Sequence, residues 1–469
     1  MAATNYKKQT HREHILSLPD TYIGSVETAT EKMFVVEDDK FVQTAVTSFN
    51  PGFYKLFDEM VVNAHDHVIR TRVKKLAPVK NITIEISSDN TSITVENDGE
   101  GIDVIEHPEH KVWIPQMIFG ELLTSTNYDK EEKKLVGGKN GYGVKLVNIY
   151  SKAFTIEIVD AKTGKKYTQT WRNNMLEVEK PKISSSKAKP YVSITWTPDF
   201  ARFGMTSKIP DDFIKVLRRR ATDLAMTVGK DIKVHWKHGE DTTTIKCRDL
   251  GVYASEYVST PVVYAQINER WAVAVADTPV EAYFHVSFVN GIWTSKGGTH
   301  VDYITNQVVN HIVEYLETKK KIKVKPSLVK ENLAIFVTSM IENPSFTSQT
   351  KETLTTKSTA FGSTCKLPEE FLKKIQSKLE LVDTLIVSQK EKDEKENKKS
   401  DGRKQSKIYG IPKLDDAAWA GTAKSSQCTL ILTEGDSAKA MALSGLSKAQ
   451  RDKFGVFPLR GKILNVKDT

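Results

Sequence analysis

The stretch GGKNGYGVK, Gly137 to Lys145, holds four glycines and two lysines within nine residues. Glycine at this density indicates that the backbone bends sharply or approaches another group closely. Backbone N–H groups and ammonium groups at the start of a helix suit an anion. The stretch therefore predicts a phosphate-binding loop, and an ordinary connection between two elements is the alternative.

Three familiar glycine-rich motifs do not fit this loop. A Walker A loop would place Lys and then Ser or Thr after Gly143, where Val144 and Lys145 stand. A dinucleotide-binding fingerprint would need a glycine at the position of Leu146. The letters GYG also occur in potassium-channel filters, but we expect no membrane segment, because no apolar run is long enough to cross a bilayer.

Composition limits the class of protein. A chain of 469 residues, 39% apolar and 27% charged, suits two or three globular domains. The net charge of +9 permits an anionic partner. The three cysteines, Cys247, Cys365 and Cys428, have no metal-ligand spacing, and the N-terminus lacks the apolar core of a signal peptide. We therefore expect a reducing compartment and no disulfide framework.

The first 240 residues mix helical and strand patterns. Residues 53–70, FYKLFDEMVVNAHDHVIR, predict a helix. Residues 81–98, NITIEISSDNTSITVEND, alternate apolar and polar side chains around a turn at 87–90, which predicts a hairpin. Residues 152–160 and 191–198 predict further antiparallel strands. Without regular βαβ alternation, this part predicts an α/β sandwich with a mixed or antiparallel sheet.

A second set of elements begins at about residue 250. Two strand patterns, RWAVAVAD and EAYFHVSFVNGIWTS, precede a predicted amphipathic helix over 299–321 and another strand in VKENLAIFVTSM. Residues 368–399 predict one long helix, whose charged continuation to Lys407 predicts a solvated helix end or a linker. The segment CTLILTEGDSAKAMALSGL, from Cys428, predicts a buried strand, an acidic turn and a helix.

Polar residues in the first part suit nucleotide chemistry. Glu59 and Asn63 lie four residues apart and project from one helix face. A carboxylate beside an apolar run can serve as a base, and a neutral amide oxygen suits a magnesium ion that carries phosphate. A solvated polar face is the alternative for either residue alone. Downstream, ENDGEGI presents Asn97 beside a tight glycine turn.

The order of these patterns resembles the Bergerat ATP site of the GHKL superfamily, in which a flexible lid covers the phosphates in place of a P-loop. Longer stretches are similar to eukaryotic-type DNA topoisomerase II. They follow the order of that family over nearly the whole chain: EHILSLPDTYIGSVE, LTSTNYD, GGKNGYGVKLVNIYS, SFVNGIWTSKGGTHVDY, IENPSFTSQTKE, GIPKLDDA, LTEGDSAKAMALSGL and FGVFPLRGKILNV.

The resemblance implies α+β and α/β architecture in several parts. These are a GHKL ATPase domain with an N-terminal arm over 1–245, a transducer domain of the ribosomal S5 domain 2 type with a long C-terminal helix over 246–405, a linker over 406–426 and the start of a TOPRIM domain over 427–469. We expect the TOPRIM segment to be incomplete, because the family's D-x-D pair and the arginine–tyrosine pair that attacks DNA are not recognisable.

The resemblance also implies roles in an ATP pocket. Glu59 matches the general base that orients water against the γ-phosphate, Asn63 the magnesium-binding asparagine and Asn97 the residue that contacts adenine. Lys351 matches a transducer lysine that reaches the γ-phosphate, and Tyr6 matches an arm tyrosine that contacts the nucleotide site of the other subunit. Further ATP contacts are expected from Ser125, Thr126, Asn127, Gly138, Lys139, Asn140, Gly141, Tyr142, Gly143, Val144, Lys145, Gln349 and Thr350.

Other residues match parts of the family that handle DNA. Glu434 of EGDSA matches the TOPRIM glutamate that assists DNA cleavage with a divalent metal, and a helix N-cap in that turn is the alternative. DNA contacts are expected from Arg460 and Lys462 of PLRGK and from a lysine turn comprising Lys319, Lys320, Lys321 and Lys323. A solvated helix end is the alternative for the lysine turn.

Three positions depart from the family pattern. NAHDH places His65 and His67 where NAADN is usual, so the second histidine replaces an asparagine that helps to hold the nucleotide. Lys139 stands where arginine is usual, which keeps the charge but loses the bidentate geometry.

The main functional hypothesis is an ATP-operated DNA gate. Two subunits would bind ATP and Mg²⁺, dimerise through their GHKL domains and capture one double-stranded DNA for passage through another, as in a homodimeric type IIA topoisomerase that relaxes supercoils and decatenates DNA. This chain by itself is not expected to cut DNA. The alternatives are an ATP-driven clamp like a chaperone or mismatch-repair protein, and a kinase of the histidine-kinase type. A nuclear location is expected, with a mitochondrion or kinetoplast and a viral factory as alternatives.

Overall fold

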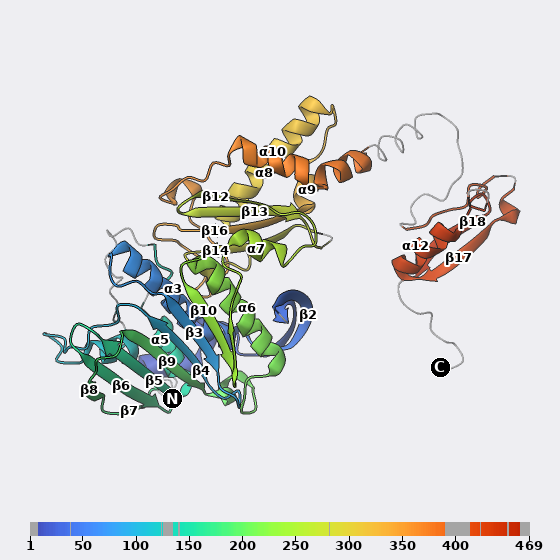
Figure 1. Cartoon of the computed structure of the whole chain (residues 1–469). Coiled ribbons are helices and arrows are strands. Elements are labelled where there is room, and N and C mark those ends of the chain that lie inside the picture. The colour runs from blue at the N-terminus through green and yellow to red at the C-terminus, as the bar shows by residue number, and fades with distance from the viewer. Residues whose placement is uncertain are drawn as a thin grey trace, which may run out of the picture. The chain divides into compact units, whose positions relative to one another are not determined.

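The computed structural model describes residues 8–37, 39–122, 124, 135–138, 141–280, 282–389, 413–422, 424–447 and 450–459. It divides into two compact units, Met1–Gln389 and Lys390–Thr469, which we describe one at a time. Figure 1 shows the two large sheets of the first unit in different regions of that unit.

The first unit contains a nine-stranded mixed sheet. Its order is β11-β10-β3-β4-β9-β5-β6-β7, with β8 paired to β6. The β10–β3 pair is parallel and the other pairs are antiparallel. The predicted hairpin over 81–98 and the predicted mixed sheet are confirmed. The strands are β3 (Asn81–Ile86), β4 (Ile93–Asp98), β5 (Ser151–Asp160), β6 (Lys165–Arg172), β7 (Glu177–Val178), β8 (Lys182–Ser185), β9 (Tyr191–Pro198), β10 (Lys233–His238) and β11 (Asp241–Thr244).

Helix α3 (Pro51–Val73) begins where its sequence favours a start. The Asn50 side chain accepts a hydrogen bond from the Phe53 N–H at 3.0 Å. Pro51 has no backbone N–H, but an N–H in the first turn of a helix has no partner within the helix, so proline fits at this position. Most of the helix is buried, and its apolar side chains share one core with the isoleucines of the sheet. The helix predicted for 53–70 is confirmed, and it runs through the interior of this part.

Shorter elements complete the first part of this unit. They are α1 (His11–Ser17), α2 (Pro19–Tyr22), β1 (Ala29–Glu37), β2 (Lys40–Phe49), α4 (Ile114–Gly120), α5 (Gly143–Ile149), the 3-10 helix η1 (Phe200–Phe203), α6 (Asp211–Val228) and α7 (Leu250–Ser255). Strands β1 and β2 form a separate antiparallel hairpin.

A five-stranded sheet with the order β12-β13-β16-β14-β15 forms the second part of the unit. Strand β13 is buried on both faces. Its larger side chains pack with α8, while its alanines meet an aromatic cluster that includes Phe41 of β2 and Tyr253 of α7. The elements are β12 (Val263–Asn268), β13 (Trp271–Asp277), β14 (Phe284–Val289), β15 (Ile292–Trp293), α8 (Thr299–Lys319), α9 (Pro326–Glu331), β16 (Leu333–Ser339), the 3-10 helix η2 (Ser358–Ala360) and α10 (Glu369–Lys378).

The long helix predicted for 368–399 is interrupted. Helix α10 ends at Lys378, the backbone of the next residue, Leu379, is extended, and a second helical segment occupies 381–389. Both oxygens of Asp277, at the end of β13, accept backbone N–H groups from the two residues after Leu379, at 3.0 and 2.9 Å. The prediction of one continuous helix was wrong, because this tertiary contact caps a new helical start.

The second unit contains β17 (Thr429–Glu434), α12 (Gly435–Gly445) and β18 (Phe454–Leu459), preceded by the 3-10 helix η3 (Ser425–Gln427). Strands β17 and β18 are parallel neighbours. The predicted strand, turn and helix are confirmed, but the prediction that the strand is buried was wrong. Leu430 and Leu432 are 53% and 52% exposed, because two strands and one helix cover only part of the strand surface.

Asp277 provides a test of the helix break. Replacing Asp277 by alanine removes both acceptors, and we expect the free energy of unfolding to fall by about 1 kcal/mol, the usual loss for a helix cap. Chemical denaturation of the variant measures this. Asp383→Ala, an exposed carboxylate on the same helical segment, is the matched control. Equal losses for the two variants would contradict the capping role.

Candidate active site

Helix α3 presents three polar side chains along one stripe. Glu59, Asn63 and Asp66 occupy positions i, i+4 and i+7, which an α-helix places one above another. The glycine-rich stretch lies against both ends of this stripe, since Gly143 meets Glu59 and Gly138 meets Asp66. Residues far apart in the sequence therefore meet at one site.

Glu59 is a buried carboxylate held between two ammonium groups. It is 3% exposed, with the Lys55 Nζ at 2.8 Å and the Lys351 Nζ at 3.8 Å from its Oε1. Burial by itself would raise the pKa of Glu59, but Lys351 and Lys55 outweigh burial and hold that pKa below its usual value. The carboxylate is therefore ionised at neutral pH and able to accept a proton.

A charge network continues from Glu59 into the second part of the unit. Lys55 also contacts Asp58 at 3.2 Å, and Asp58 pairs with Arg220 of α6 at 2.7 Å. Arg220 in turn donates to the carbonyl oxygen of Gly291, between β14 and β15, at 2.8 Å. Sequence reasoning missed these residues. The position of Lys55, four residues before Glu59 on a helix, was the available signal.

Lys351 joins the site from the loop after β16. Its backbone has a φ of 62°, and its buried ammonium donates to the Gly137 carbonyl oxygen at 3.1 Å. Burial lowers the pKa of Lys351, against the opposing influence of Glu59. In the same loop, the Thr350 and Ser348 hydroxyls lie 2.6 Å apart, and Gln349 lies between them in the sequence.

Gly143, the first residue of α5, lies directly against Glu59. A Cβ at Gly143 would stand 2.1 Å from the Glu59 Oε2, so a side chain does not fit there without movement. Gly141 has a φ of 66°, which favours glycine. The Tyr142 side chain packs against His11 and Tyr22, so the N-terminal helices border this loop.

Lys145 lies inside the loop structure. Its buried ammonium donates to the carbonyl oxygens of Thr124 and Gly141, at 2.5 and 2.8 Å. Burial lowers the pKa of Lys145 to about 8. These contacts stabilise the turn before α5. Val144, which precedes Lys145, is only partly buried.

Asn97 and His67 lie close to the glycine turn that follows β4. Asn97 is buried near the end of the strand, and its amide donates to the Asp98 carbonyl oxygen at 3.0 Å. Burial, assisted by Arg70, lowers the pKa of His67 to about 4, despite an opposing hydrogen bond to the Glu100 backbone. The imidazole that replaces the usual asparagine is therefore neutral at pH 7.

Comparison with known proteins identifies the family. A model described as histidine kinase-, DNA gyrase B- and HSP90-like ATPase matches residues 50–174, and one described as DNA gyrase B matches residues 231–405. The chain is 42% identical to the crystallised ATPase region of Saccharomyces cerevisiae topoisomerase II. The match covers 99% of that structure and 82% of this chain, with a TM-score of 0.75. The chain belongs to the DNA topoisomerase II family.

Other topoisomerase II relatives support this assignment. The ATPase and transducer domains of the Balamuthia mandrillaris enzyme are 40% identical, with a TM-score of 0.77, and the match covers 83% of this chain and 98% of that one. DNA topoisomerase 2 of Acanthamoeba polyphaga mimivirus is 45% identical over 99% of this chain, and the Saccharomyces cerevisiae enzyme is 42% identical over 100%. The chain spans 37% and 33% of the lengths of those two relatives. The expected topoisomerase II fold class is confirmed.

The lysine turn is a surface feature of this topoisomerase II chain. Lys319, Lys320, Lys321 and Lys323 are exposed at the end of α8 and just after it. Lys320 lies 6.0 Å from the centre of the Tyr315 ring, and the Lys321 backbone has a φ of 58°. The concentration of charge and its exposure are compatible with contacts to an anionic polymer.

In the second unit, Glu434 lies at the carboxyl end of β17. Glu434 is exposed and pairs in register with Leu459 of β18, so both strand ends lie at one edge. It occupies the N-cap of α12 without a side-chain capping bond, while Asp436 pairs with Lys413 at 2.5 Å.

Several predicted site residues fall outside the described residues: Tyr6, Ser125, Thr126, Asn127, Lys139, Asn140, Arg460 and Lys462.

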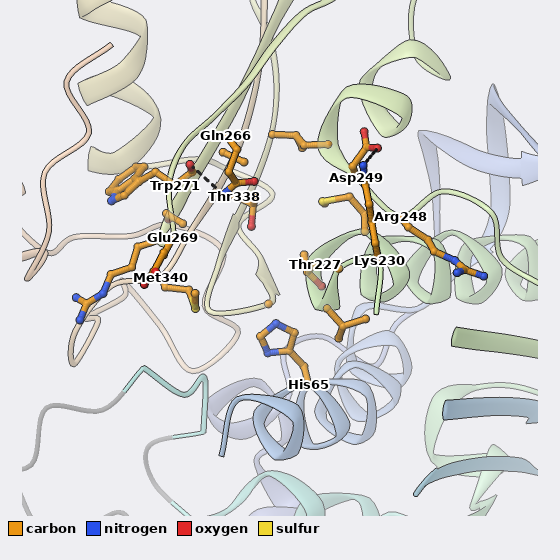
Figure 2. Close-up of a pocket in the computed structure, with 18 of the residues that line it drawn as sticks. His65, Thr227, Lys230, Arg248, Asp249, Gln266, Glu269, Trp271, Thr338 and Met340 are labelled. Carbon is orange, nitrogen blue, oxygen red and sulfur yellow. Dashed lines mark hydrogen bonds and ion pairs between the residues drawn. The ribbon is translucent and has the colours of Figure 1, made fainter. Parts of the chain in front are cut away.

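A separate cavity of about 390 Å³ lies where α3 and α6 meet the five-stranded sheet. Figure 2 shows His65 on α3 at one side of this pocket and Gln266 and Trp271 at the other. The α3 side chains that line it, His65, Ile69 and Arg72, lie on a different face from Glu59.

Among the described helices, none is both long and apolar enough to cross a bilayer.

The lowered pKa of His67 predicts a pH effect on stability. A histidine whose pKa falls from 6.5 to about 4 on folding destabilises the folded state as pH drops through that interval, because the unfolded chain binds the proton more readily. The difference corresponds to at most about 3 kcal/mol. We expect His67→Asn to reduce the fall in unfolding free energy between pH 6.5 and pH 4. Parallel stability curves for wild type and variant, from denaturation at each pH, would contradict this.

Proposed function

We propose that this chain is the ATP-hydrolysing N-terminal gate of a type IIA DNA topoisomerase. The observation that carries the proposal is the ionised, buried Glu59 in contact with Lys351, which comes from the loop after the five-stranded sheet. Membership of the topoisomerase II family supports the assignment. We assign the GHKL domain to 1–245, the transducer domain to 246–405, a linker to 406–426 and a TOPRIM segment to 427–469.

Glu59 acts as the general base in this proposal. Its carboxylate, held by Lys55, orients a water molecule toward the γ-phosphate and accepts a proton as the water attacks the γ-phosphorus, whose bond to the bridging oxygen breaks so that ADP leaves. Lys351 is close enough to the base to stabilise negative charge that develops on the phosphoryl oxygens. The contact of Gly143 with Glu59 brings the glycine loop against the reacting group.

The side chains present fit ATP and Mg²⁺. Asn63, one turn from Glu59, offers an amide oxygen of the kind that Mg²⁺ accepts beside phosphate oxygens. When bound, Mg²⁺ neutralises phosphate charge. Asn97 would contact the adenine. The remaining phosphate and sugar contacts are proposed for Ser125, Thr126, Asn127, residues 138–145 of the glycine loop, Gln349 and Thr350.

We further propose that ATP brings two copies of the chain together, with Tyr6 contacting the nucleotide site of the other subunit. The dimer captures double-stranded DNA, and the lysine turn contacts its phosphates. In the whole enzyme, Glu434 would assist cleavage with a divalent metal, while Arg460 and Lys462 contact DNA. The eukaryotic and viral relatives favour a nuclear or viral-factory enzyme.

The role of Glu59 is tested by Glu59→Gln. The amide cannot take the proton, so we expect steady-state ATP turnover to fall by at least about 100-fold, while ATP affinity changes little. Glu157→Gln, which alters a carboxylate of β5 paired with Lys166, is the matched control and should retain turnover. Near-normal turnover in Glu59→Gln would overturn the assignment.

The DNA role of the lysine turn is tested by replacing Lys319, Lys320, Lys321 and Lys323 together with alanine. We expect weaker stimulation of ATP hydrolysis by DNA. We also expect a shallower dependence of DNA affinity on salt, by roughly 0.9 in logarithmic slope for each phosphate that the variant no longer binds. Basal turnover should persist, because the turn is not part of the ATP site.

A quadruple alanine variant at other exposed lysines, Lys180, Lys182, Lys187 and Lys189, removes the same charge and is the control. Equal effects of the two quadruple variants on the salt slope would assign the effect to net charge and not to the turn.

A further inference from the structure

The segment 135–138, which we call the loop entry, leads into the glycine loop and is held by side chains from two directions. From α3, the buried Asp66 carboxylate accepts the N–H of Gly137 on one oxygen at 2.7 Å and the N–H of Gly138 on the other at 2.8 Å. Hydrogen bonds to an ionised carboxylate are stronger than those between neutral groups. Asp66 therefore restrains two successive peptide units.

The second set of contacts comes from the five-stranded sheet and the loop that follows it. The Asn290 side-chain amide donates to the Val136 carbonyl oxygen at 3.3 Å. The Lys351 ammonium donates to the Gly137 carbonyl oxygen at 3.1 Å. Asn290 is itself fixed, because its side chain also bonds the backbone N–H and carbonyl of Ile341, at 2.8 and 2.9 Å. The loop entry therefore bonds to both parts of the first unit.

Packing restricts the loop entry further. A Cβ at Gly137 would lie 2.8 Å from the Ile292 Cδ1 and 3.1 Å from the Val62 Cγ1. These neighbours belong to β15 and α3, so the backbone occupies a slot with no room for a side chain. A shift of either wall relative to the other must displace this backbone or break its hydrogen bonds.

The position of Asp66 connects this slot with the catalytic base. Asp66 and Glu59 are seven residues apart on α3 and therefore share one face. Asp66 holds the beginning of the glycine loop, while Gly143, near its end, contacts Glu59. One helix thus positions both ends of the loop.

We infer that Asp66 is a positioning residue for nucleotide binding, and that the loop entry couples the transducer residues Asn290 and Lys351 to the glycine loop. The inference rests on the proposed ATPase function. Movement of the transducer would pull on the carbonyl groups of Val136 and Gly137, while Asp66 holds the N–H groups of Gly137 and Gly138 in place against α3. Nucleotide affinity then depends on Asp66, which is not among the residues expected to contact the nucleotide.

Amide exchange tests the restraint without nucleotide. Asp66→Asn keeps the shape of the side chain but directs an NH₂ group at one glycine N–H, so exchange at Gly137 and Gly138 should accelerate by about tenfold or more. Asp160→Asn is the matched control, because Asp160 is a buried carboxylate that accepts the backbone N–H groups of Val104 and Lys162, at 2.9 Å each. Unchanged exchange at the two glycines in Asp66→Asn would overturn the inference.

Nucleotide binding tests the consequence. We expect Asp66→Asn to bind a non-hydrolysable ATP analogue at least about tenfold more weakly than wild type, while Asp160→Asn binds normally. Asn290→Ala should weaken binding as well. The effects of Asp66→Asn and Asn290→Ala should not add in the double variant, because both residues hold one segment. Wild-type affinity in Asp66→Asn, or strict additivity in the double variant, would refute the coupling.

The outcomes separate this inference from the proposed function. If wild type binds and hydrolyses ATP but Asp66→Asn behaves like wild type, the positioning role alone fails. If wild type binds no nucleotide, the proposed function fails and the coupling to nucleotide affinity fails with it. If thermal unfolding shows that Asp66→Asn does not fold, exchange and analogue binding in Asn290→Ala decide, and wild-type values in both would refute the inference.

Discussion

The burial of an ionised carboxylate is the constraint on which the site depends. Glu59 lies within a helix that is buried on most of its surface, where a charge without a partner would be strongly destabilising. Lys55 supplies one counter-charge from the same helix, and Lys351 supplies another from the loop after β16. Both counter-charges hold Glu59 in its charged form, at the place where the two parts of the first unit meet.

The same constraint explains why so many polar groups lie at this junction. Asp58 and Arg220 form a buried pair, and Arg220 bonds the Gly291 carbonyl oxygen between β14 and β15. Removing one member of such a pair leaves the other charge uncompensated, which costs far more than an exposed ion pair contributes. Glu59 and the charged residues that link the two parts of the first unit thus form one continuous network.

Much of the fold was predictable from local patterns. Alternating isoleucines predicted the β3–β4 hairpin, and the pattern around Glu59 predicted α3, because strand and helix periods are properties of short segments. The long helix after residue 368 was not predicted correctly. Its apolar spacing continues past Leu379, and nothing in that spacing reveals that Asp277, about a hundred positions earlier, caps a new start.

The sequence by itself determined the residue types of the site, their order and the helix stripe that carries Glu59 and Asn63. The resemblance to the topoisomerase II family could be recognised from the sequence because each of the motifs that carry it is a continuous stretch of residues. Only the tertiary structure decided that Lys351 meets Glu59, that Lys145 bonds carbonyl oxygens within its own loop, and that Asp66 holds the loop entry. Such contacts join residues brought together by packing, and spacing along a chain does not specify which distant surfaces will share a buried charge or a hydrogen bond.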